Sequence, residues 1–330
     1  MSSFRTKTIE TLKWSSLEKI GQAFIQLIIS VILARLLDAE IYGIIGIINI
    51  FISISSTIAD AGFSQGLIRK LKCTFDDYNA VFWCNFFISI ILYLILFFLA
   101  PYLAVLFDIE QLKILSRVLF LVIPLNAFNI VQVTIINKEL NFKAIAKYTL
   151  ISSSISGILG IGLALSGFGV WALIGQILLN ILFQILFFWR RSVWRPQWKF
   201  PFEPLKELFP FSFKLFVASF LNSVFNNAYT FLIAKLYTQT QLGFYTQANR
   251  FATQPTNLIE GILNRMTYPL LATLQNDIIA YKNAFKRIQI SIFAFVMPLM
   301  LMLFVCAPEG FPLVLGEKWN SSIPYFQIMC

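Results

Sequence analysis

The chain has 330 residues, of which 58% are hydrophobic and only 13% are charged. Soluble domains carry about 25% charged residues, so this composition excludes a soluble enzyme, a disordered chain and a disulfide scaffold. It predicts an all-α polytopic membrane protein. The net charge of +10 is best explained by basic loops on one side of the membrane rather than by a nucleic-acid partner.

The histidine and cysteine content limits the chemistry further. The sequence has no histidine, which excludes histidine acid–base catalysis, histidine proton relays and most zinc sites. The four cysteines show no CxxC spacing and are expected to be free thiols, with no disulfide framework and no metal site.

Apolar windows predict ten membrane spans, since a helix that crosses the hydrocarbon core needs about 20 apolar residues. The first six are expected at about 14–35, 40–60, 77–108, 117–138 and, as a hairpin, 147–190. The hairpin should turn at Gly167-Phe168-Gly169, where glycines permit a tight reversal. Spans seven to ten are expected at about 208–234, 243–271, 288–307 and from 322. Because the tenth is still apolar at Cys330, we expect the chain to be cut off inside a hydrophobic segment.

The basic residues of the loops alternate between the two sides. One set of loops holds clusters such as Arg69-Lys70 and the stretch from Arg190 to Lys206, whereas the opposite set holds only Arg35, Lys113, Lys235 and Lys318. This bias predicts a cytoplasmic N-terminus. The outer loops are too short to form an extramembrane catalytic domain.

Two segments match when the sequence is shifted by 200 residues. The matched residues are Ala34-Arg35-Leu36 with Ala234-Lys235-Leu236, Gly43 with Gly243, Asn49 with Asn249 and Phe51 with Phe251. Six spans separate the two copies, so orientation is preserved and a parallel repeat is indicated. This predicts an N-terminal six-helix lobe over residues 1–200 and an incomplete lobe over 201–330, with about ten of twelve or more helices present.

Polar residues recur at helical spacing on spans one, two, seven and eight. One interpretation is that these polar residues only pack the helices against one another. In that case an arginine and a glutamate form an internal salt bridge, and the side chains of Lys214 and Arg265 extend to the membrane surface. Charges such as Arg250 and Glu260 favour a water-filled, substrate-facing cavity instead. The candidate substrate-binding residues are Arg250, Lys214, Arg265, Asn222, Asn226, Gln247, Gln254, Asn49 and Gln22.

The charges of this predicted cavity suggest its ligands. Arg250, Lys214 and Arg265 suit an anion such as a phosphate or pyrophosphate. Asp60, Glu260 and Glu18 are candidates for ion coupling, with Na⁺ or H⁺ as the ion, and no cofactor is expected.

Several motifs resemble one bacterial membrane-protein family. They are Trp14-Ser15-Ser16, Leu33-Ala34-Arg35-Leu36-Leu37, Tyr42-Gly43, Asp60-Ala61-Gly62-Phe63, Gly167-Phe168-Gly169-Val170-Trp171-Ala172-Leu173, Trp194-Arg195-Pro196, Leu242-Gly243-Phe244-Tyr245, Asn249-Arg250 and Leu315-Gly316-Glu317-Lys318-Trp319. In this order they resemble the Wzx-type polysaccharide repeat-unit flippases of lipopolysaccharide biosynthesis, most similarly the colanic-acid-exporter branch. These flippases belong to the multidrug/oligosaccharidyl-lipid/polysaccharide exporter superfamily.

The resemblance implies a MATE-like bundle of two six-helix lobes around a central cavity that opens alternately to each side. It implies a bacterial inner-membrane location and transfer of undecaprenyl-diphosphate-linked oligosaccharides from the cytoplasmic to the periplasmic leaflet. Arg250 matches a cavity position thought to hold the diphosphate, and polysaccharide polymerase machinery is an expected partner beside membrane lipids. Family members usually have twelve or more spans, so the resemblance implies that a C-terminal part is missing.

Three alternatives stay open at this point. A multidrug exporter of the same superfamily would use acidic residues such as Asp60 and Glu260 for cationic drugs. A flippase for peptidoglycan lipid precursors has similar physics. An enzyme, such as a glycan polymerase or lipid-sugar glycosyltransferase, is disfavoured because the loop with Asp38-x-Glu40 is too short to form a site. The glycan, the energy source and the oligomeric state do not follow from the sequence.

Overall fold

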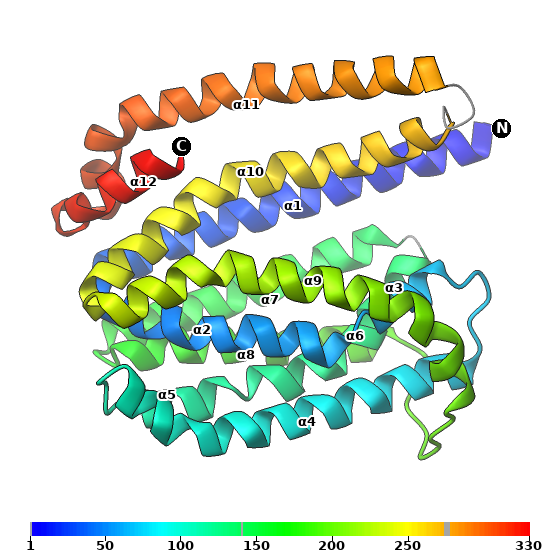
Figure 1. The fold of residues 1–330 in the computed structure, drawn as a ribbon, viewed down its shortest axis with the longest axis horizontal. Helices are drawn as coiled ribbons and strands as arrows, with labels where there is room; N and C mark the ends of the chain where they lie inside the picture. The colour runs from blue at the N-terminus through cyan, green and yellow to red at the C-terminus, as the bar shows by residue number, and fades with distance from the viewer. Residues whose placement is uncertain (1, 140, 274–277) are drawn as a thin grey trace. The chain divides into compact units, whose positions relative to one another are not determined.

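The computed structural model describes residues 2–139, 141–273 and 278–330, and in this part it contains helices and no strand (Figure 1). Side chains are described for residues 19–139, 141–256 and 278–330, except those of 279 and 295. The chain divides into two compact units, Met1–Gly243 and Phe244–Cys330. The lobes expected at 1–200 and 201–330 are defined by the repeat rather than by compactness, and they stay a prediction.

The helices of the first unit are α1 (Ser2–Leu36), α2 (Ala39–Asp60), α3 (Phe63–Arg69), α4 (Phe75–Leu106), α5 (Leu112–Leu119), α6 (Val122–Lys138), α7 (Phe142–Leu165), α8 (Val170–Arg191) and α9 (Glu203–Leu236). Helix α10 (Gln239–Thr273) begins in this unit. The second unit adds α11 (Ile278–Leu315), a short 3₁₀-helix (Glu317–Ser322) and α12 (Ile323–Met329).

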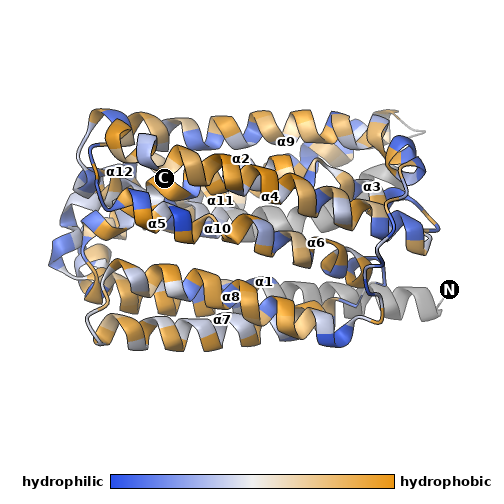
Figure 2. Cartoon of the chain, turned by 90° about the horizontal axis from the view of Figure 1, so that it is seen from below, coloured by the Kyte–Doolittle hydropathy of each residue, from blue (hydrophilic) through white to orange (hydrophobic). Residues whose placement is uncertain are grey.

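Eight described helical segments are long and apolar enough to cross a membrane, and they correspond to predicted spans one to seven and nine. The multi-pass architecture is therefore confirmed. Within the first unit, hydrophobic residues follow the middles of α4 and α8, and hydrophilic residues gather in the loops at the helix ends (Figure 2). The predicted eighth span forms α10, which is not among the eight, and the side chains of α10 from residue 257 on lie outside the described residues.

Two local features differ from the prediction or refine it. The fourth span is interrupted after Leu119, so it consists of α5 and α6 instead of one helix. The short helix α3 was not expected. The hairpin is confirmed, because α7 ends at Leu165, α8 begins at Val170, and the glycines between them have φ angles of +80° and +54°. Such angles are accessible to glycine at little cost.

Helix α2 organises the first unit. It packs against α9, α4 and α6, while α1 packs on α7 and α7 on α8. The basic stretch after α8 is held against α4, since Trp83 Nε1 donates to the Gln197 carbonyl at 2.7 Å and Asn79 Nδ2 donates to the Lys199 carbonyl at 2.5 Å. The connection between the two predicted lobes is therefore an ordered segment rather than a loose linker.

The 200-residue repeat is visible where α2 and α10 begin. Asp38 is the N-cap of α2, and Thr238 accepts a hydrogen bond from the Gln241 backbone N–H at the start of α10. A Cβ on Gly43 would lie 2.0 Å from the Gln239 carbonyl oxygen, and a Cβ on Gly243 would lie 1.8 Å from that of Ala39. The two helices thus cross backbone to backbone through glycines that occupy the same place in each repeat.

Candidate substrate and ion site

Helix α2 carries one amide side chain, that of Asn49, outside its buried face. Its neighbours Ile48 and Ile50 are buried, whereas Asn49 is exposed. Ile48 and Ile50 lie in the apolar span Ala39–Asp60. Polar side chains in such spans usually face the bundle interior or water rather than lipid. Asn49 thus lies outside the buried contacts of α2, and its role in the expected cavity stays a prediction.

The contact between α2 and α9 is a closed polar seam. Ser53 Oγ and Ser223 Oγ lie 3.2 Å apart, and Asn227 Nδ2 donates to Ser53 Oγ at 3.2 Å and to the Ser223 carbonyl at 2.8 Å. These groups satisfy one another without a ligand. They act as the interhelical hydrogen bonds common in membrane bundles.

A polar pocket lies on another side of α2, between the end of α2, the short helix α3 and α6. Its volume is about 380 Å³. Most of its lining side chains are polar, and they comprise Ser56, Asp60, Ser64, Gln65, Asn126, Asn129, Thr134 and Asn137. Such a concentration of carboxylate, amide and hydroxyl groups inside a membrane bundle is a candidate functional site by default.

Asp60 is placed in this pocket by a sharp reversal of the chain. Helix α2 ends at Asp60, and Ala61 and Gly62 follow with φ angles of 45° and 73°. The reversal directs the chain into α3, where the Asp60 carboxylate accepts hydrogen bonds from Ser64 Oγ at 2.7 Å and from the Ser64 backbone N–H at 3.3 Å. A Cβ on Gly62 would lie 2.4 Å from the Ser212 carbonyl oxygen on α9, so this turn requires a glycine.

Two lining groups have no partner. Asn129 is only 6% exposed, and neither its amide oxygen nor its amide nitrogen forms a hydrogen bond with a described residue. The Ser56 hydroxyl is likewise buried and unsatisfied. Buried polar groups are nearly always paired, and an exception needs an explanation such as a bound ligand, ion or water.

The charges of the lining restrict what the pocket can accept. Its residues, all of which are described, include one carboxylate and no lysine or arginine. One negative charge with several neutral oxygen donors suits a cation or a proton. Amides and a carboxylate also suit hydrogen bonds to sugar hydroxyls. The lining does not suit a diphosphate, because it has no positive charge.

Charged residues at one end of the first unit join several helices. Lys70, after α3, donates to Asp77 on α4 at 3.0 Å and to Glu207 on α9 at 2.6 Å. The hydrogen bond to Glu207 is the largest cause of the raised pKa of Lys70, so the lysine stays charged at neutral pH. Lys138 Nζ donates to the Leu67 carbonyl at 3.0 Å and also to the Lys70 carbonyl, at the C-terminal end of α3. This is where a cation stabilises a helix.

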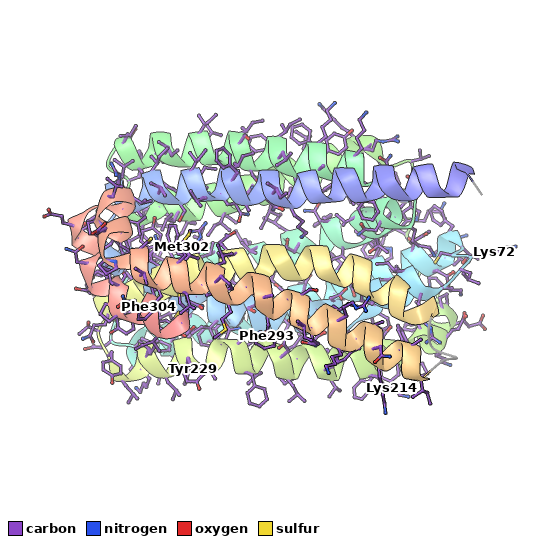
Figure 3. The ribbon with its side chains drawn as sticks, turned by 90° about the horizontal axis from the view of Figure 1, so that it is seen from above. Lys72, Lys214, Tyr229, Phe293, Met302 and Phe304 are labelled. Carbon is purple, nitrogen blue, oxygen red and sulfur yellow. The ribbon has the colours of Figure 1, made fainter. Side chains whose placement is uncertain are left out.

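The structure places the predicted site residues in different surroundings. Asn49, Lys214, Asn222 and Asn226 are exposed, Gln22, Asp60, Arg250 and Gln254 are half-buried, and Gln247 is buried. Lys214 lies in the first half of α9, and Tyr229 lies nearer its C-terminal end (Figure 3). The side chains of Glu18, Glu260 and Arg265 lie outside the described residues. Of the predicted set, only Asp60 lines the polar pocket, so the grouping of the others stays a prediction.

Most of the lining residues that the sequence analysis does not predict lie on α6, and Ser64 and Gln65 lie on α3. Asn126, Asn129 and Asn137 line the pocket from α6, and their spacing keeps them near one face. Their signal in the sequence is a set of amides within an apolar span that is not one of the repeat-related spans.

Comparison with known proteins gives the family. The family model described as "Polysaccharide biosynthesis protein" matches residues 32–324. The chain belongs to this family. The chain is 25% identical to the succinoglycan biosynthesis transport protein ExoT of Rhizobium meliloti, over 96% of this chain and 64% of that protein. It is also 25% identical to the lipopolysaccharide biosynthesis protein WzxC of Escherichia coli, over 99% of this chain and 67% of that protein. It spans about two thirds of the length of these relatives.

The fold is shared with solved transporters. The lipid II flippase MurJ in an inward-closed conformation aligns with a TM-score of 0.68 and 17% identity, over 95% of this chain and 71% of that chain. Multidrug transporters of the MATE family align with TM-scores of 0.54 to 0.64. The MATE-like fold and the Wzx-type resemblance expected from the sequence are therefore confirmed.

Proposed function

We propose that this protein is a flippase that moves undecaprenyl-diphosphate-linked oligosaccharide repeat units across a bacterial inner membrane by alternating access. The physical problem is to carry a sugar and a diphosphate past about 30 Å of hydrocarbon while the prenyl tail stays in lipid. The match of the polysaccharide-biosynthesis family model over residues 32–324 is the observation that supports this role best, and the polar pocket around Asp60 offers a place for the coupling cation. A bundle that served only as an anchor would gain nothing from an unsatisfied amide such as Asn129. The names of ExoT, WzxC and MurJ support the same class of cargo.

In this proposal the basic and acidic residues have separate tasks. Arg250, with Lys214 and Arg265, holds the diphosphate, because guanidinium and ammonium groups bind phosphate oxygens through charge-assisted hydrogen bonds. Asn49, Asn222, Asn226 and the glutamines Gln22, Gln247 and Gln254 contact glycan hydroxyls. Asp60 takes the coupling Na⁺ or H⁺, and Glu18 and Glu260 are further candidates.

The orientation and the partners belong to the proposal as well. The N-terminus is cytoplasmic, the protein performs no enzymatic step, and the released repeat units pass to polysaccharide polymerase machinery. A phosphatase fused at Gly167 should then be active, because this turn lies on the periplasmic side. An inactive phosphatase at this position, together with an active cytoplasmic reporter, would contradict the proposed topology.

A multidrug exporter of the MATE type is the second candidate, and a specific observation favours it. The pocket holds a carboxylate without a basic neighbour in its lining, which is suitable for a cationic drug. The two candidates differ in what a deletion strain should show.

The test is deletion of the gene in its host, followed by extraction of the lipid-linked oligosaccharides. A flippase predicts that complete undecaprenyl-diphosphate repeat units accumulate on the cytoplasmic side and that re-expression of the gene reverses this. Re-expression of Arg250→Ala should insert normally in the membrane and fail to reverse it. Sensitivity to cationic drugs without accumulation would instead favour the multidrug exporter and contradict the flippase.

A further inference from the structure

A second pocket lies at the end of the first unit where α4 begins and where α6 and α8 end. Its volume is about 440 Å³. Its polar and aromatic lining residues are Phe75, Tyr78, Glu139, Arg191, Ser192 and Trp194. It shares no lining residue with the pocket around Asp60, and the transport proposal does not use it.

Three aromatic rings form one wall of this second pocket. The ring of Trp194 lies 5.9 Å from that of Phe75 and 6.3 Å from that of Tyr78, measured between ring centroids. The faces of aromatic rings attract cations, and clusters of such rings bind ammonium groups. This wall therefore suits a positively charged amine.

The pocket also carries one charge of each sign. Glu139 and Arg191 are both exposed lining residues, and in the described part of the chain neither forms a salt bridge with the other or with a third residue. Their charges cancel, so the lining as a whole favours neither an anion nor a cation. A ligand that bears both charges at a separation of a few bonds matches this arrangement.

The donors around this pocket differ in accessibility. Arg191 is an exposed lining residue, whereas Trp194 Nε1 and the Ser192 hydroxyl are buried and cannot be reached from the pocket. The neighbouring Arg195 is already engaged, since its guanidinium donates to the Ser192 carbonyl at 2.7 Å and to the Trp189 carbonyl at 2.5 Å at the end of α8. Arg191 thus offers the accessible guanidinium donors of the kind that bind phosphate oxygens.

The surroundings indicate that the ligand is a lipid. The lining residue Val193 is 96% exposed, and Trp198, in the same stretch as Arg190 and Lys199, is 81% exposed. Apolar and tryptophan side chains mixed with basic residues are typical of the boundary between headgroups and hydrocarbon. A headgroup can enter the pocket while its acyl chains stay beside these apolar side chains.

We propose that this pocket binds the headgroup of a zwitterionic aminophospholipid such as phosphatidylethanolamine. The ammonium group lies against Glu139 and the rings of Tyr78 and Trp194, and the phosphate accepts hydrogen bonds from the Arg191 guanidinium. The bound lipid joins the ends of α4, α6 and α8. It is a structural ligand, distinct from any transported molecule.

The test is native mass spectrometry of the purified, delipidated protein after titration with equal amounts of phosphatidylethanolamine and phosphatidylglycerol. The wild type should retain one phosphatidylethanolamine in preference to phosphatidylglycerol. Arg191→Ala should weaken this binding about tenfold or more, because a hydrogen bond to a charged group is lost. The matched control is Arg190→Ala, which removes the same charge from the adjacent residue outside the lining and should leave binding unchanged.

Two other variants address folding and ligand identity. Trp194→Phe replaces the indole by a smaller aromatic ring, so it should fold and still bind phosphatidylethanolamine more weakly, because the cation–π contact with the ammonium group is weaker. Glu139→Gln should abolish the preference over phosphatidylglycerol. Equal retention of both lipids by the wild type, or equal losses in Arg190→Ala and Arg191→Ala, would overturn the proposal. Equally tight binding of soluble glycerophosphoethanolamine would overturn the assignment to a lipid.

Discussion

Helix α2 carries two polar clusters that differ in one respect. Ser53 forms a seam with Ser223 and Asn227 on α9, and the three side chains satisfy one another. One to two turns further on, Ser56 and Asp60 face α6, where Asn129 stays buried without a hydrogen bond to a described residue. Similar residue types on one helix thus form a closed contact in one place and an open pocket in the other.

The difference shows how polar residues in a membrane bundle can be sorted. A hydrogen bond between helices contributes only about 0.6 kcal/mol on average, so a mutually satisfied seam is sufficiently explained by packing. Asp60 is the last residue of α2, and its carboxylate lines a pocket in which Asn129 has no hydrogen bond to a described residue, so packing alone does not account for this cluster. The seam and the pocket are therefore distinguished by whether their polar groups form hydrogen bonds with one another, and not by how polar they are.

Replacement of Asp60 by Asn should have the largest effect on this comparison. The variant keeps the size of the side chain and removes the only charge of the pocket lining. If Asp60 takes a coupling cation, transport should fall about 10- to 100-fold, because a charge-assisted interaction of about 1.5–3 kcal/mol is lost. The measurement is the rate at which lipid-linked oligosaccharide appears in the periplasmic leaflet.

The control is Asp108→Asn, at an exposed carboxylate between α4 and α5 that lies outside the pocket. Asp108 has a φ angle of 56°, a conformation that asparagine also tolerates. Transport should be normal in this variant. If transport is also normal in Asp60→Asn, the pocket takes no part in the transport mechanism.

Replacement of Asn129 by Leu should separate stability from transport. The substitution keeps the number and branching of the heavy side-chain atoms and removes two buried polar atoms without a described partner, so the free energy of unfolding should rise or stay unchanged. Transport should fall about tenfold, because the pocket loses an amide ligand. The two measurements are the thermal midpoint of the purified protein and flipping in cells. A variant that is less stable and fully active would mean that Asn129 is a structural residue.

The fold could be predicted because membrane insertion imposes simple rules. About 20 apolar residues mark a span, and glycines mark a tight turn, so most spans and the turn at Gly167 were located correctly. The break between α5 and α6 also has a local cause, since Pro124 lies in the first turn of α6 and lacks the N–H that would continue α5. The short helix α3 carries no such signal, because it depends on contacts between segments far apart in sequence, such as the approach of Gly62 to Ser212.

The site was predicted less completely for a related reason. Helical spacing shows which residues share a face, but it does not show what that face contacts. The stripe expected on α9 included Asn222 and Asn226, which are exposed, whereas the hydrogen-bonded residues are Ser223 and Asn227, each one position further on. Asp60 was identified from its charge, whereas the α6 residues that line the same pocket emerged only with the tertiary structure.

Adjacent cysteines on α9 should sharpen the contrast between the open and closed faces. In a background with the four native cysteines replaced by serine, a cysteine at Asn226 should react with a water-soluble thiol reagent. A cysteine at Asn227 should react at least about tenfold more slowly, because this side chain is half-buried at the seam. Equal reactivity would contradict the closed seam, and an inert cysteine at Asn226 would place that residue outside the aqueous path.

The smallest expected effect concerns the seam itself. In a double-mutant cycle, Ser53→Ala and Asn227→Ala should show a coupling energy of about 0.6 kcal/mol in the free energy of unfolding, with transport nearly unchanged. Ser53→Ala combined with Ser89→Ala is the control pair. Ser89 donates to the Phe86 carbonyl within its own helix, so this pair should show no coupling. A coupling well above about 2 kcal/mol, or loss of transport in the single variants, would mean that the seam opens during the transport cycle and is not merely a packing contact. The difference between the two clusters of α2 would then reflect the conformational state of the protein, and not two different types of contact.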